Sequence, residues 1–418
     1  MNILIIIIFV ITGTLLGTAT GLTPGLHVNN VALLALMFYQ TGANPLYLSA
    51  LVVSAVIAHT FLDFIPSTFL GAPEADTALS VLPMHRLLLS GRGFKAVYLS
   101  AVGSALAMLI ALPLIVFIFL FLSFVTYSSL KYYIPVILIT IILFLLYEES
   151  KKSIGSMLTA LYIFIISGAF GWLVFHLPQN DNFFPISFHT ELLFPMFTGL
   201  FGIPTLILSK NASIPPQKIE KMSMEKSNFL SSLYGTVSGA LVGFLPGITS
   251  GIASVIARGM YGSDETEEFI VTLGSVNTAN ALFNLAALFI IMHPRSRAVG
   301  VISNMVKVTP WVCFLHPPVI FIILLIAAFI SATLSFFLTV ELGKFFTKIT
   351  EKLGERYGHL SMGILITLVI ITFLITGVLG LIILVIGSAI GLLPPKLGVM
   401  RVHLMACILL PVLIFYLS

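Results

Sequence analysis

Apolar residues fill this chain in long blocks, separated by short polar segments and by segments that contain Pro and Gly. A membrane-spanning helix needs about 20 apolar residues, and runs of that kind recur along the whole sequence. We therefore predict an all-α polytopic membrane protein with about twelve membrane crossings. The predicted crossings are residues 2–21, 46–70, 96–125, 133–147, 154–175, 190–208, 228–245, 266–292, 311–340, 360–377, 379–393 and 402–417.

The composition supports a lipid environment. Hydrophobic residues make up 58% of the chain and charged residues 9%, whereas soluble proteins are about 25% charged. The net charge of +4 suits a membrane protein whose cytoplasmic loops collect Lys and Arg, and it favours no nucleic-acid partner. We expect a multi-pass protein of the cytoplasmic membrane, in contact with the lipid bilayer.

Three features narrow the interpretation of the ends and loops. The first apolar run has no basic segment before it, so we predict a retained helix rather than a signal peptide. Cys313 and Cys407 lie in apolar surroundings and suggest neither a disulfide framework nor a Cys-based metal site. The polar segment Glu341–His359 has charges at helical spacing, typical of an interfacial amphipathic helix or a solvated connecting helix.

A Pro-Gly phrase occurs twice, at Gly13–Gly25 and again at Gly235–Gly247, with the pattern Gly-Thr-x-x-Gly-x-x-x-Gly-x-x-Pro-Gly. Each copy lies inside an apolar stretch. Proline lacks a backbone N–H and glycine adopts positive φ readily, so we predict that the helix breaks at each copy. Secondary transporters build substrate sites near the bilayer midplane from such broken helices.

The duplication divides the chain into a first membrane repeat (1–209), a polar linker (210–227) and a second membrane repeat (228–418). Asp63 aligns with Asn284 if the second half is one residue shorter. The Lys residues of the linker favour its cytoplasmic placement. The sequence leaves open whether the repeats are inverted or parallel.

The start of each half-helix after a break suits an anion, because its N–H groups and dipole are positive. The alternative is a simple Pro kink in which the glycines only permit close helix packing. The residues expected to bind an anionic substrate at the two breaks are Thr23, Pro24, Gly25, Asn29, Asn30, Pro246, Gly247, Thr249 and Ser250.

Asp63 lies deep in an apolar run, four residues after His59 and on the same helix face. An ionisable residue at such a depth is a functional hypothesis by default, here a group that couples Na⁺ or H⁺ with Asn284 as its repeat partner. The alternative places Asp63 at the mouth of the helix. Asn277, Asn280 and Asn284 form a polar stripe that lines a substrate cavity or bonds to neighbouring helices.

Two Pro-containing segments differ in charge. Gly71–Asp76 is acidic, and Glu74 or Asp76 suits a cation or an arginine partner; His293–Arg297 is basic. Arg295 and Arg297 suit carboxylate or phosphate oxygens, and the alternatives are a salt bridge between the segments or snorkelling to the interface. The remaining basic cluster, interpreted as a cytoplasmic loop, comprises His85, Arg86, Arg92 and Lys95.

The chain carries no P-loop, no zincin His-Glu-x-x-His and no Gly-x-Ser-x-Gly elbow. We therefore expect no enzyme activity and no cofactor other than a coupling ion. A third hypothesis, an intramembrane enzyme, would require a nucleophile and a base at the spacing of a known motif, and the sequence has no such pair.

Several segments together resemble the TctA family, the large membrane subunit of tripartite tricarboxylate transporters. They are Gly21-Leu-Thr-Pro-Gly25, Ile65–Leu79 running into Gly91–Ala96, Gly243-Phe-Leu-Pro-Gly247 and Asn277-Thr-Ala-Asn280. The resemblance implies a cation-coupled carboxylate carrier that works with a small membrane subunit and an extracytoplasmic binding protein. The chain is shorter than family members, and Glu74 stands where they commonly carry a small residue, which points to a stand-alone, archaeal-type branch.

The function predicted from the sequence is thus secondary transport of a small anion by alternating access, coupled to Na⁺ or H⁺. The rival is a polyprenyl-phosphate flippase, because Pro246–Gly251 also resembles the Pro-Gly-x-Ser-Gly-Gly element of those transporters. Assembly into a homo-oligomer stays open.

Overall fold

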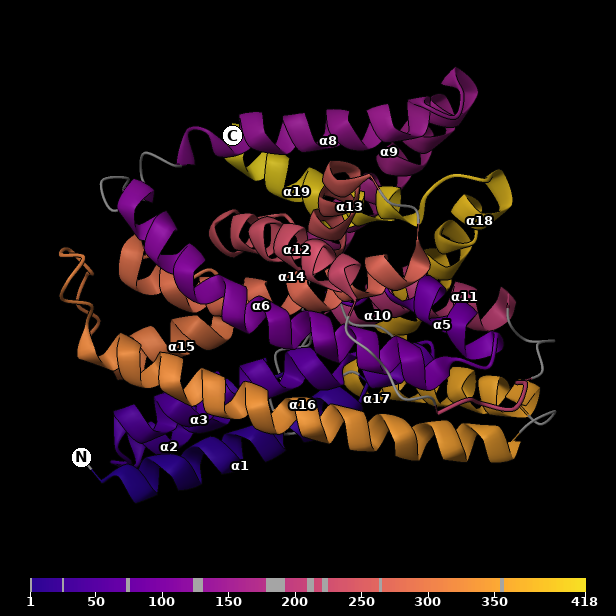
Figure 1. The fold of residues 1–418 in the computed structure, drawn as a ribbon. Coiled ribbons are helices and arrows are strands. Elements are labelled where there is room, and N and C mark those ends of the chain that lie inside the picture. The colour runs from indigo at the N-terminus through magenta and orange to yellow at the C-terminus, as the bar shows by residue number, and fades with distance from the viewer. Residues whose placement is uncertain are drawn as a thin grey trace.

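A computed structural model describes residues 2–24, 26–72, 76–122, 131–177, 192–208, 214–219, 225–262, 265–353 and 357–418. These residues are mainly helical, as predicted, and their one isolated β-bridge pairs Cys313 with His316 (Figure 1). The helices are α1 (Ile3–Leu22), α2 (Asn29–Gln40), α3 (Pro45–Leu62), α4 (Phe64–Phe69), α5 (Val81–Leu89), α6 (Gly93–Leu122), α8 (Ile134–Ser150), α9 (Ile154–His176), α10 (Leu193–Phe197), the π-helix η1 (Thr198–Gly202), α11 (Ile203–Leu208), α12 (Lys226–Phe244), α13 (Ser250–Tyr261), α14 (Thr266–Ile290), α15 (Arg297–Met305), α16 (Val319–Leu353), α17 (Tyr357–Gly391), α18 (Leu393–Leu397), the 3₁₀ helix η3 (Arg401–Met405) and α19 (Ala406–Leu417).

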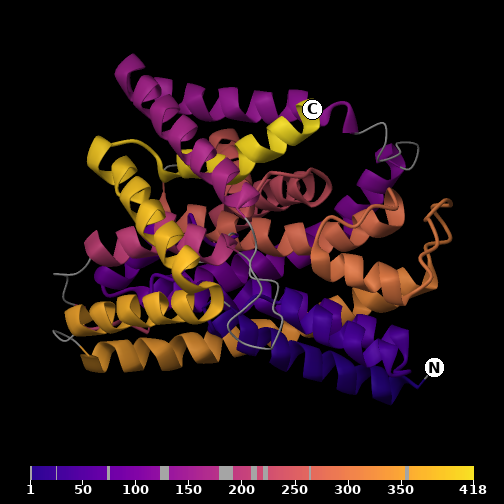
Figure 2. The same cartoon turned by 180° about the vertical axis from the view of Figure 1, so that it is seen from behind.

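Seven helical stretches of the described chain are long and apolar enough to cross a membrane. Fewer than the predicted twelve qualify, for local reasons. Helix α8 has 17 residues, and the apolar runs 360–377 and 379–393 join in α17, which turns at Gly377 with φ 65° (Figure 2). The seven stretches are Ile3–Leu22, Pro45–Phe69, Gly93–Phe121, Ile154–His176, Thr266–Ile290, Val319–Lys352 and Ser361–Leu397, with shorter apolar stretches at Leu193–Leu208 and Arg401–Leu417.

The glycines of the duplicated phrase bring α1 against α3 and α12 against α14 in the same way. A Cβ at Gly17 would lie 2.2 Å from the carbonyl O of Ala55, and one at Gly239 would lie 2.8 Å from that of Val276. Only glycine permits these backbone approaches. The other pairs are Gly13 with Leu51, Gly21 with Leu62, Gly235 with Thr272 and Gly243 with Phe283. Each contact of the second half spans one residue less, as the alignment of Asp63 with Asn284 requires.

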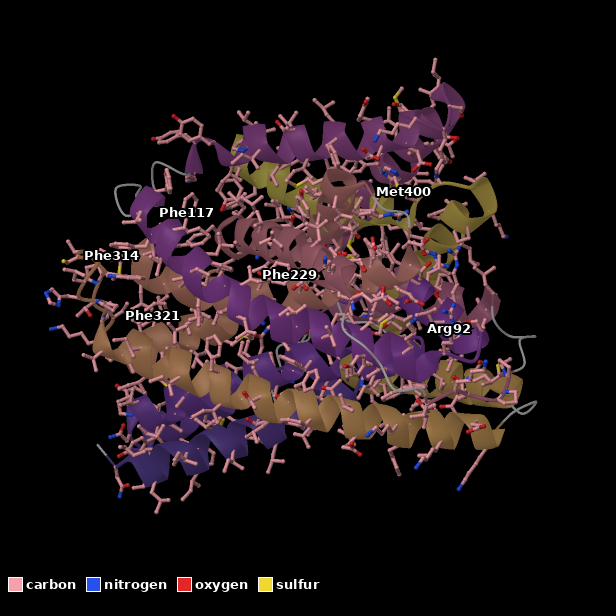
Figure 3. The ribbon with its side chains drawn as sticks, viewed as in Figure 1. Arg92, Phe117, Phe229, Phe314, Phe321 and Met400 are labelled. Carbon is pink, nitrogen blue, oxygen red and sulfur yellow. The ribbon has the colours of Figure 1, made fainter. Side chains whose placement is uncertain are left out.

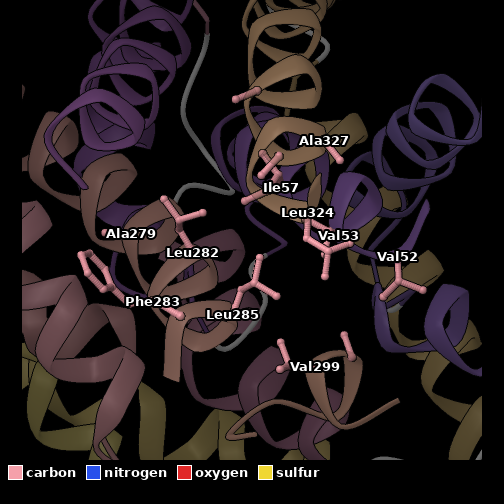
Figure 4. Close-up of a cluster of buried hydrophobic side chains, with 14 of the residues drawn as sticks. Val52, Val53, Ile57, Ala279, Leu282, Phe283, Leu285, Val299, Leu324 and Ala327 are labelled. Atoms are coloured by element: carbon pink, nitrogen blue, oxygen red, sulfur yellow. The ribbon is translucent and has the colours of Figure 1, made fainter. Parts of the chain in front are cut away.

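A shared apolar core joins α3, α14, α15 and α16. Figure 4 shows Ile57 of α3, Leu282 of α14, Val299 of α15 and Leu324 of α16 converging in this core. At about 1.5 Å per residue, α16 is longer than the apolar layer of a bilayer, which is about 30 Å thick. Its polar end continues the same helix to Leu353, so the amphipathic helix predicted over Glu341–His359 is not a separate element up to that residue.

The basic segment interpreted as a loop is instead partly helical. His85 lies in α5 and is buried. Arg92 precedes α6 and forms an ion pair with Glu267 of α14 at 2.8 Å, and Lys95 binds the same carboxylate at 2.6 Å. These pairs fix the start of α6 to the start of α14.

Candidate functional site

The first Pro-Gly segment separates two helices. Helix α1 ends at Leu22, and α2 begins at Asn29. Thr23 is exposed and Pro24 is partly buried between them, whereas Gly25 lies outside the described residues. Asn29 and Asn30 occupy the first turn of α2, partly buried, as expected for the start of a half-helix.

The second Pro-Gly segment has the same form. Helix α12 ends at Phe244 and α13 begins at Ser250. Gly247 has φ +80°, and a Cβ there would meet the side chain of Val412 at 2.7 Å. Thr249 caps α13, because its side chain accepts a hydrogen bond from the N–H of Ile252 at 3.4 Å.

Arg295 supplies the hydrogen bonds that this break leaves unmade. The carbonyl of Val242 would normally accept from the residue four positions later, which is Pro246 and has no N–H. Arg295 Nη1 donates to that carbonyl instead, and Nη2 donates to the carbonyl of Ile248 at 2.5 Å. The arginine expected to hold substrate thus binds the backbone of the break itself.

Asp76 occupies the N-terminus of α13. Its Oδ1 accepts from the backbone N–H of Ser250 at 3.2 Å and from the Ser250 hydroxyl at 2.8 Å. Asn280 extends this contact, since its Nδ2 donates to Ser250 Oγ at 3.4 Å and its Oδ1 accepts from Arg295 Nη1 at 2.9 Å. The acidic and the basic Pro-containing segments therefore meet through Ser250 and Asn280.

The charge on Arg295 is balanced within this network. Burial lowers the pKa of the Arg295 guanidinium to about 10, and the nearby Asp76 and Tyr416 act in the opposite direction. Arg295 therefore stays protonated at neutral pH and faces Asp76 electrostatically. Glu74 and Pro73 of the acidic segment lie outside the described residues.

Asp63 lies at the junction of α3 and α4, 4% exposed. Its Oδ2 accepts a hydrogen bond from Asn277 Nδ2 at 2.9 Å. Beside it, the hydroxyls of Thr60 and Thr278 lie 3.1 Å apart. A residue of the first half is thus held by the polar stripe of α14.

The asparagine stripe of α14 contacts both halves of the chain. Asn277 binds Asp63, Asn280 binds Ser250 and Arg295, and Asn284 Nδ2 donates to Asn280 Oδ1 at 3.0 Å. Among the described side chains no hydrogen bond joins Asn29 or Asn30 to the stripe, and Arg297 is exposed at the start of α15.

A cavity of about 80 Å³ opens at the second break. One water needs about 10–15 Å³ on this measure, so the cavity has room for several waters or a small anion. Its walls are Gly243, Phe244, Pro246, Ala287, Ile291, His293, Arg295 and Tyr416.

The sequence left open which residue Asp76 contacts, and it gave no sign that Thr60 pairs with Thr278. Both contacts join residues far apart in the chain, and neither follows from a local motif. Within the described residues no group of three or more His, Cys, Asp or Glu side chains is suited to a metal ion.

Residues 7–406 match the family described as "Tripartite tricarboxylate transporter TctA family". The chain is similar to the uncharacterized protein MJ1079 of Methanocaldococcus jannaschii, with 30% identity over 98% of this chain and 99% of that protein. No solved structure matches. With its apolar helices, the chain is a multi-pass protein of the cell membrane and belongs to the tripartite tricarboxylate transporter TctA family.

Proposed function

We propose that this protein is a secondary transporter that moves a small anion by alternating access around the α14 stripe. Membership of a transporter family supports transport across the membrane. The observation that carries the proposal is that α14 binds Asp63 of the first half through Asn277 and Ser250 of the second through Asn280. A rearrangement of either half would therefore change the contacts of the same asparagine stripe on α14.

The family relationship and the second break support a carboxylate substrate. The first N–H of α13 and the Ser250 hydroxyl both donate to the carboxylate of Asp76, so these two donors suit a carboxylate oxygen. A substrate carboxylate binds at the same donors when Asp76 moves away, with Thr249 and Gly247 beside it. Thr23, Pro24, Asn29 and Asn30 of the first break are the proposed counterpart from the other half of the chain.

Asp63 is the proposed coupling group. It is buried and accepts a hydrogen bond from the side-chain amide of Asn277. Protonation of its carboxylate would couple H⁺, and coordination of Na⁺ by the carboxylate and neighbouring oxygens would couple Na⁺. Asn284 Oδ1, at the position aligned with Asp63, is buried and accepts no hydrogen bond from a described residue.

Repetition of the glycine contacts supports a two-repeat architecture with a linker at 210–227. The family relationship favours a small membrane subunit and an extracytoplasmic binding protein as partners. The archaeal relative supports the stand-alone branch, in which the chain works without them.

A binding screen tests the proposal. Purified protein is titrated with di- and tricarboxylates and with a polyprenyl phosphate, each with and without Na⁺. We expect saturable binding of a carboxylate that Na⁺ or pH alters. Binding of the lipid phosphate alone would favour the flippase, and binding of neither would contradict both functions.

A further inference from the structure

Arg401 has a buried guanidinium group, and it lies far from both Pro-Gly breaks in the sequence. It is the first residue of η3 and is 8% exposed. Its Nη1 donates to Thr205 Oγ1 of α11 at 2.7 Å, and this hydroxyl donates onward to the carbonyl of Phe201 at 2.8 Å. Thr205 thereby fixes one side of the guanidinium.

The other edge of this guanidinium has no hydrogen-bond partner among the residues that the structure describes. Arg401 Nε and Nη2 are buried and make no hydrogen bond to any described residue. These two nitrogens form one edge of the guanidinium, with parallel N–H groups that match the two oxygens of a carboxylate or phosphate. Arg295 differs, because protein oxygens occupy both of its Nη atoms.

Two basic side chains of α5 act on Arg401. Arg86 and His85 of α5 both lie within electrostatic reach of it. Burial lowers the pKa of His85, the carbonyl of Thr68 opposes this shift, and Arg401 lowers the pKa further. Within the described part of the chain, Arg401 forms no ion pair with a carboxylate. A buried charge without a counter-charge is strongly unfavourable.

The position of Arg401 is fixed by its neighbours in the chain. Glu149 of α8 accepts from the backbone N–H of Met400 at 3.2 Å and lies 3.4 Å from His403 Nε2. Lys152 pairs with the same carboxylate at 2.7 Å. Glu149 is thus occupied by other groups and is not the counter-ion of Arg401. In Figure 3, Met400 lies toward the right of the view, above Arg92.

We propose that Arg401 and Thr205, with Arg86 and His85 nearby, form an oxyanion-binding site that is distinct from the Arg295 network. The ligand is a carboxylate or phosphate group that accepts from the Nε and Nη2 edge of Arg401. It supplies the negative charge and the two acceptors that the described residues do not provide to Arg401. The inference concerns binding and holds whether or not the chain transports the same anion.

Titrations of the purified full chain in phosphate-free buffer and a neutral detergent test the site. The probes are inorganic phosphate, citrate and a short-chain phosphatidic acid. We expect saturable binding of at least one probe and a higher melting temperature in its presence. Phosphate or citrate binding indicates a soluble ligand, and binding of phosphatidic acid alone indicates a lipid headgroup. A wild-type protein that binds none of the three overturns the proposal.

The variant Arg401→Gln separates a ligand site from a structural contact. We expect its affinity for the bound probe to fall about tenfold or more. Without any probe, its melting temperature should equal or exceed that of the wild type, because a buried positive charge has been removed. Arg92→Gln is the matched control: it removes one surface cation whose partner Glu267 keeps Lys95, so probe binding should be unchanged.

Two results would overturn the assignment. One is undiminished binding by Arg401→Gln. The other is a lower melting temperature or failure to fold in probe-free buffer, which would make Arg401 a structural residue. Thr205→Val provides a second test, since losing the hydroxyl that holds Nη1 should weaken binding while Arg401 keeps its charge.

Discussion

Asn277 donates from its side-chain amide to Oδ2 of Asp63 at 2.9 Å, and this bond joins the two halves of the chain in the interior. A hydrogen bond to a charged group contributes about 1.5–3 kcal/mol, and an unpaired carboxylate there would be costly. Asn280, one turn further along α14, binds Ser250 at the second break. One face of α14 therefore makes hydrogen bonds to both halves of the chain.

Asp63→Asn tests the coupling group. The variant should fold and insert, because an amide fits the same space and can still bond to Asn277, but uptake should lose its dependence on Na⁺ or pH. Uptake into liposomes at varied Na⁺ and pH measures this. Glu267→Gln, at the ion-paired start of α14, should leave the dependence intact. An Asp63→Asn protein that keeps the wild-type dependence would return Asp63 to a structural role.

Gly247→Val tests the second break. The φ of +80° costs a residue with a Cβ about 1–2 kcal/mol, and the new side chain would overlap Val412. Substrate binding should be lost. Gly42→Val is the matched control, because Gly42 has φ +94° with no atom within 4 Å of its Cβ position. Normal transport by Gly247→Val would reduce the Pro-Gly segment to a kink.

Arg295→Gln tests the stabilisation of the break. It leaves the carbonyls of Val242 and Ile248 without their donor, so the free energy of unfolding should fall by about 1–3 kcal/mol, and anion binding should weaken by a similar amount. Arg297→Gln, at an exposed position, should change stability by less than about 0.5 kcal/mol. Thermal unfolding in detergent compares the two. Equal effects of both substitutions would contradict the role given to Arg295.

Asp76→Asn tests whether an internal carboxylate competes with the substrate. A neutral amide is a weaker acceptor than a carboxylate for the N–H and hydroxyl of Ser250. We therefore expect tighter binding of the carboxylate substrate, measured by titration. Weaker binding would instead indicate that Asp76 helps to hold the substrate, for example through a bound cation.

Glu149→Gln tests the support of η3. Burial raises the pKa of the Glu149 carboxyl, but hydrogen bonds from His403, Lys152 and the Met400 N–H outweigh it and lower the pKa overall. The charged form is thus stabilised by folding, and this stability is lost as the pH falls through the folded-state pKa. The variant should be less stable by about 1–3 kcal/mol near pH 7, and its melting temperature should depend less on pH in the acid range. If the melting temperature of the variant fell with decreasing pH as steeply as that of the wild type, the role given to Glu149 would be contradicted.

Local features of the sequence account for the helix ends beside the two Pro-Gly segments. The helices stop at Leu22 and Phe244 and restart at Asn29 and Ser250 because Pro and Gly act on the backbone within a few residues. The number of crossings could not be predicted in the same way. Apolar runs fix neither helix ends nor bends, as the turn of α17 at Gly377 shows.

The contacts of the candidate site could not be predicted from the sequence, because they join residues that only the fold brings together. Arg295 was singled out for its charge, but its partners are backbone carbonyls, which no side-chain pattern reveals. Arg401 stands at the edge of an apolar run without a motif, and its partner Thr205 lies 196 residues away. Asp63 was found because an acid within an apolar run is conspicuous wherever it occurs.

Gradient-driven uptake by the purified chain tests the central claim most directly. The protein is reconstituted alone into liposomes, and uptake of a labelled di- or tricarboxylate is followed with an inward Na⁺ or H⁺ gradient and without one. We predict uptake above the external concentration only with the gradient, and none for Asp63→Asn. A wild-type protein that binds a carboxylate but equilibrates it equally well without any gradient would contradict coupled transport.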